Sequence, residues 1–238
     1  MKNDRRRFLF TGMSMGAAPW LAITPFAIAG EETSDKQRTN ESTDEGISAP
    51  EDLMREHGVL NRVLLIYEEG LRRLRANEGV PPEVFHKPAT LIRKFVEDYH
   101  ERNEENFIFP EFEKQKQHSE LVRTLRQQHE AGRKLTDVVL RDATSDRFVK
   151  PDSRKEIIRS CDAFIRMYRP HEAREDTILF PALYKLISAK QIRDLGDQFE
   201  EKEHQLLGSE GFEKAVDEVA AIEKQLGIYD LSKFTPKL

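Results

Sequence analysis

The feature that most constrains this chain is an internal repeat. Residues 100–110 and residues 171–181 share the pattern His-Glu-x-x-Glu-acidic-x-x-Ile/Leu-Phe-Pro, and the two segments are offset by 71 residues. Two further histidines, His57 and His129, are separated by 72 residues and extend the same repeat. Self-similarity at nearly the same offset indicates two copies of a structural unit that pack against each other. Each copy supplies one lone histidine and one His-x-x-x-Glu pair.

The residues around these histidines have the periodicity of α-helices. Apolar side chains recur in alternating steps of three and four, which is the pattern of a helix with one buried face. The first helix is predicted to begin at residues 48–50 and to end at residues 77–82, where Gly79 and two prolines occur. Its inward stripe comprises Leu53, His57, Leu60, Leu64, Tyr67, Leu71 and Leu74.

Three more long helices are predicted. The second runs from about residue 85 to residue 104 or beyond, and Pro110 is expected to end or kink it. The third runs from Ser119, a good N-cap, to about residue 141. The fourth begins at residues 151–153, and Pro181 is expected to end it. Their inward stripes comprise, in turn, Ile92, Val96, His100, Glu104 and Phe107; Val122, Leu125, His129, Gly132 and Val139; and Ile157, Cys161, Phe164, Tyr168, His171, Glu175 and Ile178.

Two shorter helical patterns follow at about residues 188–207 and 212–226, and a Gly-Ser-Glu-Gly sequence separates them. Long helices with short connections become antiparallel neighbours. We therefore expect an all-α fold, an antiparallel up-down four-helix bundle over residues 50–187. Two additional helices in a C-terminal extension, residues 188–238, are expected to cover an end or a flank of the bundle.

Residues 1–29 have the composition of an export signal. The charged sequence Arg5-Arg6-Arg7-Phe8-Leu9 precedes an apolar run that ends in Ala27-x-Ala29. This order is typical of a secretory signal peptide, and the arginine pair before Phe-Leu resembles a twin-arginine signal. An uncleaved membrane anchor is the alternative, but the prolines in the run and the small-residue end favour cleavage. We expect a periplasmic protein, exported folded and not stably inserted in the membrane after cleavage, with residues 30–49 as a disordered polar linker.

Charge and cysteine content exclude several classes of protein. Lys and Arg number 38 against 43 Asp and Glu, the net charge is -5, and the body of the chain has no cluster of basic residues. Nucleic-acid binding needs such a cluster, so we exclude a nucleic-acid partner. Cys161 is the only cysteine, which excludes an intramolecular disulfide and a Cys-rich zinc site.

Six polar residues lie on the inward stripes. Histidine and glutamate at positions i and i+4 share a helix face, so both can contact one ion. Buried groups of this kind are costly unless they are paired or bound to metal, and imidazole with carboxylate suits iron, zinc, copper or manganese. Bridging carboxylates particularly suit a dinuclear iron or manganese site. The sequence favours a metal site over an empty polar network, with the ligands His57, His100, Glu104, His129, His171 and Glu175.

This constellation resembles the hemerythrin-like HHE cation-binding domains over about residues 49–186. The intervals between the four histidines are 43, 29 and 42 residues, a spacing most similar to that of the di-iron proteins linked to iron-sulfur cluster repair. The resemblance implies a cofactor of two non-haem iron ions, with manganese or zinc less favoured. It also implies that the four histidines are terminal ligands, while Glu104 and Glu175 bridge the two irons.

Arg133 departs from the oxygen-carrying members of that family, which place a second histidine there, four residues after the first in the third helix. The resemblance therefore implies more open metal positions, and it favours reaction with O2, NO or peroxide over oxygen carriage. The short cysteine-containing N-terminal domain of the repair proteins is replaced here by the export signal and linker.

Three functions stay open at this point. The first is a module that binds a small diatomic or peroxide ligand. The second is a di-iron enzyme or iron donor in iron-sulfur cluster repair or in nitrosative and oxidative stress defence. The third is a metal-free helical interaction domain. The sequence identifies no catalytic residue, electron donor or oligomeric state.

Several other residues have the chemistry of a site but a less specific pattern. Glu101 and Glu172 directly follow the paired histidines, and they are either partners of the ligands or solvated carboxylates. Tyr99 and Tyr168 are expected to pack in the core, with hydrogen bonding near the site as the alternative. Surface positions are expected for His86, His118 and His204, and a core position for Cys161.

Overall fold

The computed structural model describes residues 47–237, so the predicted signal peptide and most of the predicted linker lie outside the described residues. The described part of the chain is helical throughout, without a strand. None of its helices has a stretch long and apolar enough to cross a membrane. Helix α1 (Ala49–Arg75) is capped by Ser48, whose capping box with Glu51 satisfies backbone groups at the helix start.

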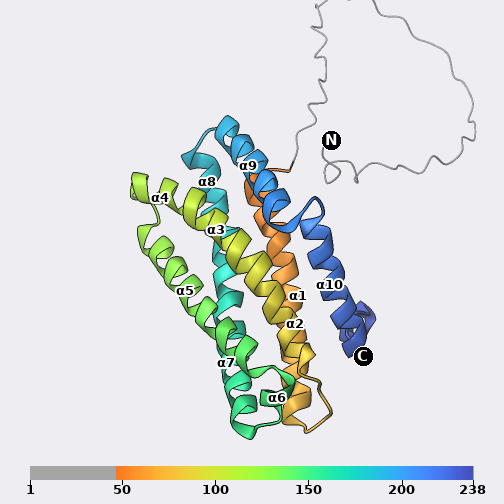
Figure 1. Cartoon of the computed structure of the whole chain (residues 1–238). Helices are drawn as coiled ribbons and strands as arrows, with labels where there is room; N and C mark the ends of the chain where they lie inside the picture. The colour runs from red at the N-terminus through yellow and green to blue at the C-terminus, as the bar shows by residue number, and fades with distance from the viewer. Residues whose placement is uncertain (1–46, 238) are drawn as a thin grey trace, which may run out of the picture. The chain divides into compact units, whose positions relative to one another are not determined.

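The predicted four-helix bundle is confirmed, and Figure 1 shows its four long rods side by side. Helix α1 contacts the second and fourth rods, and α5 contacts them from the opposite side, so the rods form a closed ring. A short helix, α6 (Ser145–Phe148), lies in the connection between the third and fourth rods. The rods are α1 (Ala49–Arg75); α2 (Glu83–Leu91), η2 (Ile92–His100), α3 (Glu101–Asn103), η3 (Glu104–Ile108) and α4 (Phe109–Gln115); α5 (Ser119–Asp142); and α7 (Pro151–Arg174), η4 (Glu175–Leu179) and α8 (Phe180–Leu186).

Both repeated His-x-x-x-Glu pairs run into a π-helical turn, η3 in the second rod and η4 in the fourth. Pro181 was expected to end its helix and Pro110 to end or kink its own, but neither proline ends a helix, because α4 and α8 continue beyond them. Proline lacks an N–H, and its ring clashes with the carbonyl four residues earlier in an α-helix. In the wider turn the N–H of Phe109 bonds to the carbonyl of Glu104, five residues back, so the rod accommodates the proline.

The π turns also change which residues face inward. Phe107 and Ile178 were expected on the inward stripes, but Phe107 is only half-buried and Ile178 is 41% exposed. Their successors, Ile108 and Leu179, are fully buried instead. A π turn holds one more residue than an α turn, so the inward face comes one residue later in both halves.

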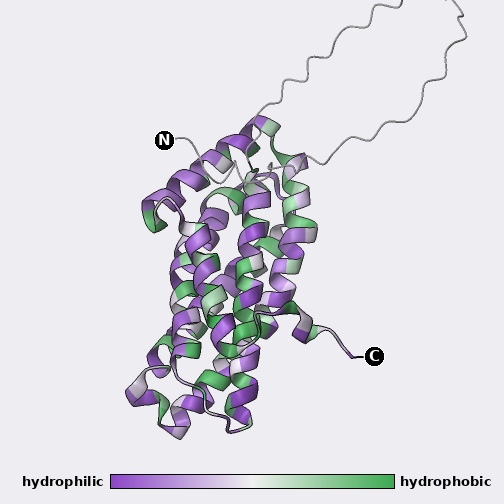
Figure 2. Cartoon of the chain, turned by 90° about the vertical axis from the view of Figure 1, so that its right-hand side faces the viewer, coloured by the Kyte–Doolittle hydropathy of each residue, from purple (hydrophilic) through white to green (hydrophobic). Residues whose placement is uncertain are grey.

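The two additional helices are α9 (Ala189–Leu207) and α10 (Gly211–Leu226), and both pack along α1 on the flank of the bundle. This decides between the two expected placements, an end or a flank. A short 3-10 helix, η5 (Leu231–Phe234), follows them. Figure 2 shows hydrophilic and hydrophobic residues alternating along each rod, as expected for helices with one buried face.

The apolar core is divided into two clusters, and along every rod one cluster lies on each side of the histidine that is a candidate ligand. One cluster contains residues from α10, with Leu60 of α1 and Tyr168 of α7 among its members. The other contains residues from α9, with Leu53 of α1 and Leu125 of α5. His57 lies between Leu53 of one cluster and Leu60 of the other. The other candidate ligands likewise lie between residues of the two clusters along their own rods. The polar residues therefore form a layer enclosed by apolar side chains.

Candidate metal centre

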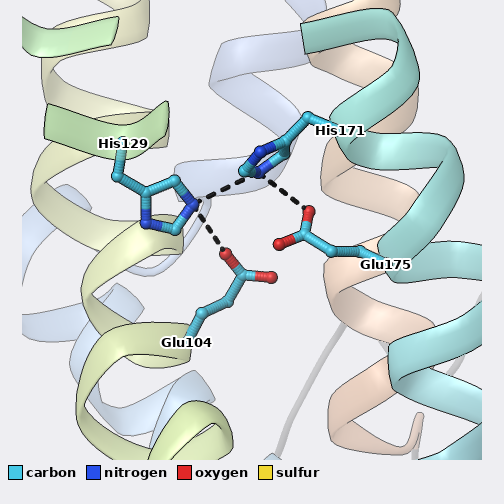
Figure 3. A group of neighbouring side chains, drawn as sticks. All are labelled: Glu104, His129, His171 and Glu175. Carbon is cyan, nitrogen blue, oxygen red and sulfur yellow. Dashed lines mark hydrogen bonds and ion pairs between the residues drawn. The ribbon is translucent and has the colours of Figure 1, made fainter. Parts of the chain in front are cut away.

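The structure brings all six predicted ligand residues together in this layer. Each has at most 3% of its surface exposed. One ligand atom from each of Glu104, His129, His171 and Glu175 lies within 4.8 Å of the others, and Figure 3 shows these four side chains converging from three rods. The same holds for His57, His100 and Glu104, so Glu104 belongs to both groups.

The histidines point their Nε2 atoms toward the two glutamates. His171 Nε2 lies 3.1 Å from Glu175 Oε2, and His57 Nε2 lies 3.4 Å from the same oxygen. His129 Nε2 is 3.4 Å from Glu104 Oε2, and His100 Nε2 is 3.8 Å from it. The histidines form two pairs of neighbouring rings, His57 with His100 and His129 with His171, whose centroids are 4.8 Å and 5.0 Å apart.

The Nδ1 atom of every histidine in the layer is held by an acceptor on a neighbouring rod. Glu56 on the first rod holds His100 on the second at 2.7 Å, and Glu105 on the second holds His129 on the third at 3.1 Å. The other two contacts follow the same direction around the bundle. The third rod holds the fourth through Gln128 and His171 at 2.8 Å, and the fourth holds the first through Asp176 and His57 at 2.7 Å.

These four acceptors were missed by the sequence reasoning, although part of the signal was present. Glu105 and Asp176 occupy the acidic position that follows the glutamate in both copies of the repeat. Glu56 and Gln128 each precede a lone histidine. When Nδ1 donates to such an acceptor, Nε2 keeps its lone pair for a metal ion, which is the usual support of a metal-bound histidine.

The charges in the layer fit a bound cation. None of the four carboxylate oxygens of Glu104 and Glu175 has a hydrogen bond to a described residue. Burial and the nearby Glu175 raise the pKa of Glu104 well above its usual value. Burial opposes ionisation of Glu175 too, but His171 and His57 hold its pKa well below the usual range. Buried carboxylates without hydrogen bonds are costly, and a metal ion removes that cost.

Burial also keeps two of the histidines neutral, which is the form that binds metal. Burial lowers the pKa of His129 to about 4 and that of His100 well below its ordinary value. His57 behaves differently: burial lowers its pKa, but the neighbouring carboxylates of Asp176 and Glu175 outweigh this effect and raise the pKa well above its usual value. The donor set of imidazoles and carboxylates thus fits a divalent transition metal.

Glu101 and Glu172, the residues beside the ligands, are buried and hydrogen-bonded. The alternative that they are solvated carboxylates was therefore wrong. Glu101 accepts a hydrogen bond from Tyr168 Oη at 2.5 Å and pairs with Arg133 at 2.7 Å. Glu172 accepts one from the amide of Asn61. Burial raises the pKa of each of these two glutamates to about 8. Tyr168 therefore both packs in the core and hydrogen-bonds beside the site.

The remaining candidates lie as expected with one exception. His118 and His204 are exposed, and Cys161 is buried in the core. His86 is half-buried rather than exposed. Tyr99 is buried, and its hydroxyl donates to the carbonyl of Phe199 in α9 at 3.4 Å.

Comparison with known families identifies the domain. The model of the hemerythrin HHE cation binding domain matches residues 48–183, and a second, overlapping match covers residues 125–235. The chain belongs to the hemerythrin HHE family. All six candidate ligands of this HHE domain lie within the first match, and the structure groups them in two clusters that could hold metal. Their individual roles as ligands stay a prediction.

Two relatives of this HHE protein are the uncharacterized protein Mb2018 of Mycobacterium bovis and the uncharacterized protein Rv1995 of Mycobacterium tuberculosis. Each is 50% identical over 190 residues, which is 80% of this chain and 74% of the relative. No solved structure matches the chain.

Proposed function

We propose that this protein is a non-haem di-iron protein that binds or reacts with small oxidants, namely O2, NO or peroxide. The observation that carries the proposal is the layer itself. Four inward Nε2 atoms surround two buried carboxylates whose oxygens have no hydrogen bonds to described residues. His57 and His100 would hold one iron and His129 and His171 the other, with Glu104 and Glu175 between them.

Bound iron would supply electrons to the oxidant, and the protein's own residues prepare the site for that chemistry. Apolar clusters on both sides of the layer exclude bulk water. The ring of acceptors keeps each imidazole oriented with Nε2 inward. Arg133 turns its guanidinium to Glu101 and Glu105, so it adds no donor to the six candidate ligands. Six ligand residues for two metal ions leave room for a small ligand.

A metal analysis with a visible spectrum tests this proposal. The full-length protein is loaded with Fe2+ anaerobically, desalted and then exposed to O2. We expect about two iron ions per chain and a new charge-transfer absorption after O2. His100→Ala is expected to lower the iron content. Iron well below one ion per chain, with no change in His100→Ala, would falsify the di-iron proposal.

The same centre can act as a binding module or as an enzyme, and the spectrum together with a turnover assay separates these two functions. An absorption that reverses when O2 is removed supports binding. Steady consumption of NO or peroxide that is lost in Glu175→Ala supports catalysis. The metal-free interaction domain is disfavoured, because Glu104 and Glu175 would then remain as buried acidic groups without hydrogen bonds to any residue that the structure describes.

We also propose that the protein is exported to the periplasm by the twin-arginine route. The support is the sequence of residues 1–29, with its arginine pair before Phe-Leu and its Ala-x-Ala end. Replacing Arg5 and Arg6 by lysine keeps the charge but removes the twin arginines. We expect that variant to accumulate unprocessed in the cytoplasm, as measured by cell fractionation. Normal processing of the variant would argue for another route.

A further inference from the structure

The two halves of the centre have equivalent ligands but different charges around them. Residues of α1 and α5 correspond at an offset of 72, as His57 and His129 show. At this offset Glu56 corresponds to Gln128, and each holds the Nδ1 atom of a histidine on the next rod. One half thus supports its histidine with a carboxylate and the other half with a neutral amide.

A second pair of corresponding residues changes the charge in the same direction. Asn61 in α1 corresponds to Arg133 in α5 at the same offset. Asn61 donates its neutral amide to Glu172, whereas the guanidinium of Arg133 pairs with Glu101. The repeat therefore places a cation beside one half of the centre and an amide beside the other.

The remaining acceptors differ as well. Glu105, which holds His129, shares its carboxylate with Arg133 and Arg102, each at 2.7 Å. Asp176, which holds His57 at 2.7 Å, forms no ion pair with a lysine or arginine among the described residues. The negative charge of Glu105 is thus compensated, while that of Asp176 is not.

Together these contacts make the His57–His100 half more negative than the His129–His171 half. In the first half the carboxylates of Glu56 and Asp176 hold the histidines. In the second half the acceptors are the neutral amide of Gln128 and the carboxylate of Glu105, which pairs with two arginines. A carboxylate acceptor makes an imidazole a stronger donor to metal than an amide does, and a negative charge beside the site attracts a cation.

We propose that the two halves bind divalent metal with unequal affinity, the His57–His100 half first and more tightly. This inference rests on the proposed function, because it requires that two metal ions bind. Changes in the groups that support metal ligands typically alter metal affinity by about 10–100-fold. We therefore expect dissociation constants that differ by at least about tenfold. The His129–His171 half is then the one from which metal exchanges more easily.

The test is a titration of the full-length, metal-free protein with Fe2+ under anaerobic conditions, in competition with a chromophoric chelator. The wild-type protein should show two separate binding steps. His100→Ala is expected to remove the tighter step, and His171→Ala the weaker one. The readout is an affinity, so it is independent of any activity of the loaded protein.

Two substitutions of nearly equal size, Glu56→Gln and Gln128→Glu, replace the acceptor of each half by that of the other half. Glu56→Gln is expected to weaken the tighter step by about 10–100-fold and to leave the weaker step unchanged. Gln128→Glu is expected to strengthen the weaker step. Circular dichroism checks that both variants keep the helical fold, and each variant tests the inference by itself.

The outcomes separate this inference from the proposed function. Two steps of equal affinity in the wild-type protein would overturn the inference alone, as would a Glu56→Gln variant that changes the weaker step. Loss of the tighter step in His171→Ala would reverse the assignment and also overturn it. Absence of Fe2+ binding would overturn the proposed function itself.

Discussion

Replacing Glu104 by alanine is expected to remove most of the metal from the protein while leaving its metal-free fold intact. Glu104 belongs to both groups of candidate ligands, so its loss affects both halves of the centre. Without metal it is a fully buried carboxyl group without hydrogen bonds to described residues. The alanine variant leaves a cavity, which is destabilising, but it also removes the free-energy cost of burying a carboxyl group away from water. Because these two effects oppose each other, the stability of the metal-free protein should change by at most about 1 kcal/mol.

Iron content and thermal unfolding, each with and without Fe2+, measure this effect. At a metal concentration of about 100 times Kd, binding at one site stabilises the folded wild-type protein by about 2.7 kcal/mol. The Glu104→Ala protein should show little of that gain. Glu120→Ala is the matched control, because the Glu120 side chain in α5 is 85% exposed and pairs only with Arg123 among the described residues. Wild-type metal content in Glu104→Ala would show that Glu104 is not a ligand.

Replacing Gly132 by alanine is expected to destabilise the protein by about 2–4 kcal/mol, from overpacking and a weakened buried hydrogen bond. A Cβ atom at Gly132 would lie 2.2 Å from Tyr168 Oη and 2.9 Å from its ring. Tyr168 is buried, stacks on Phe164 at 4.2 Å and donates to Glu101, so it cannot move without losing contacts. The better helix propensity of alanine, about 1 kcal/mol, is too small to compensate.

The control for this variant is Gly58→Ala in α1. Apart from its chain neighbours and the nearby backbone of its own helix, nothing lies within 4 Å of a Cβ at Gly58, which is an exposed position inside α1. That variant should be stabilised by about 0.5–1 kcal/mol, because alanine costs less backbone entropy than glycine. Urea unfolding of both variants gives the comparison. Adding Tyr168→Phe to Gly132→Ala should recover part of the loss, and equal stability of the two alanine variants would contradict the clash.

Much of the fold follows from local patterns in the sequence. The stripe from Leu53 to Leu71 predicts α1, because the spacing of buried residues in an α-helix is set by the backbone alone. The same geometry explains why His100 and Glu104 could be placed together on one face. The inward positions of Phe107 and Ile178 were wrong for the same reason. A pattern based on α-helical spacing does not register an extra residue in a π turn.

The sequence by itself determined the helical class, the two-fold repeat and the set of six candidate ligands, since these depend on spacing within single helices. The tertiary structure alone decided which acceptor holds which histidine and where α9 and α10 pack. Contacts such as Glu56 with His100 join separate rods, and they depend on how far each helix is rotated when its neighbours pack against it. The same contacts place Arg133 against Glu105 and thereby decide the unequal charge of the two halves.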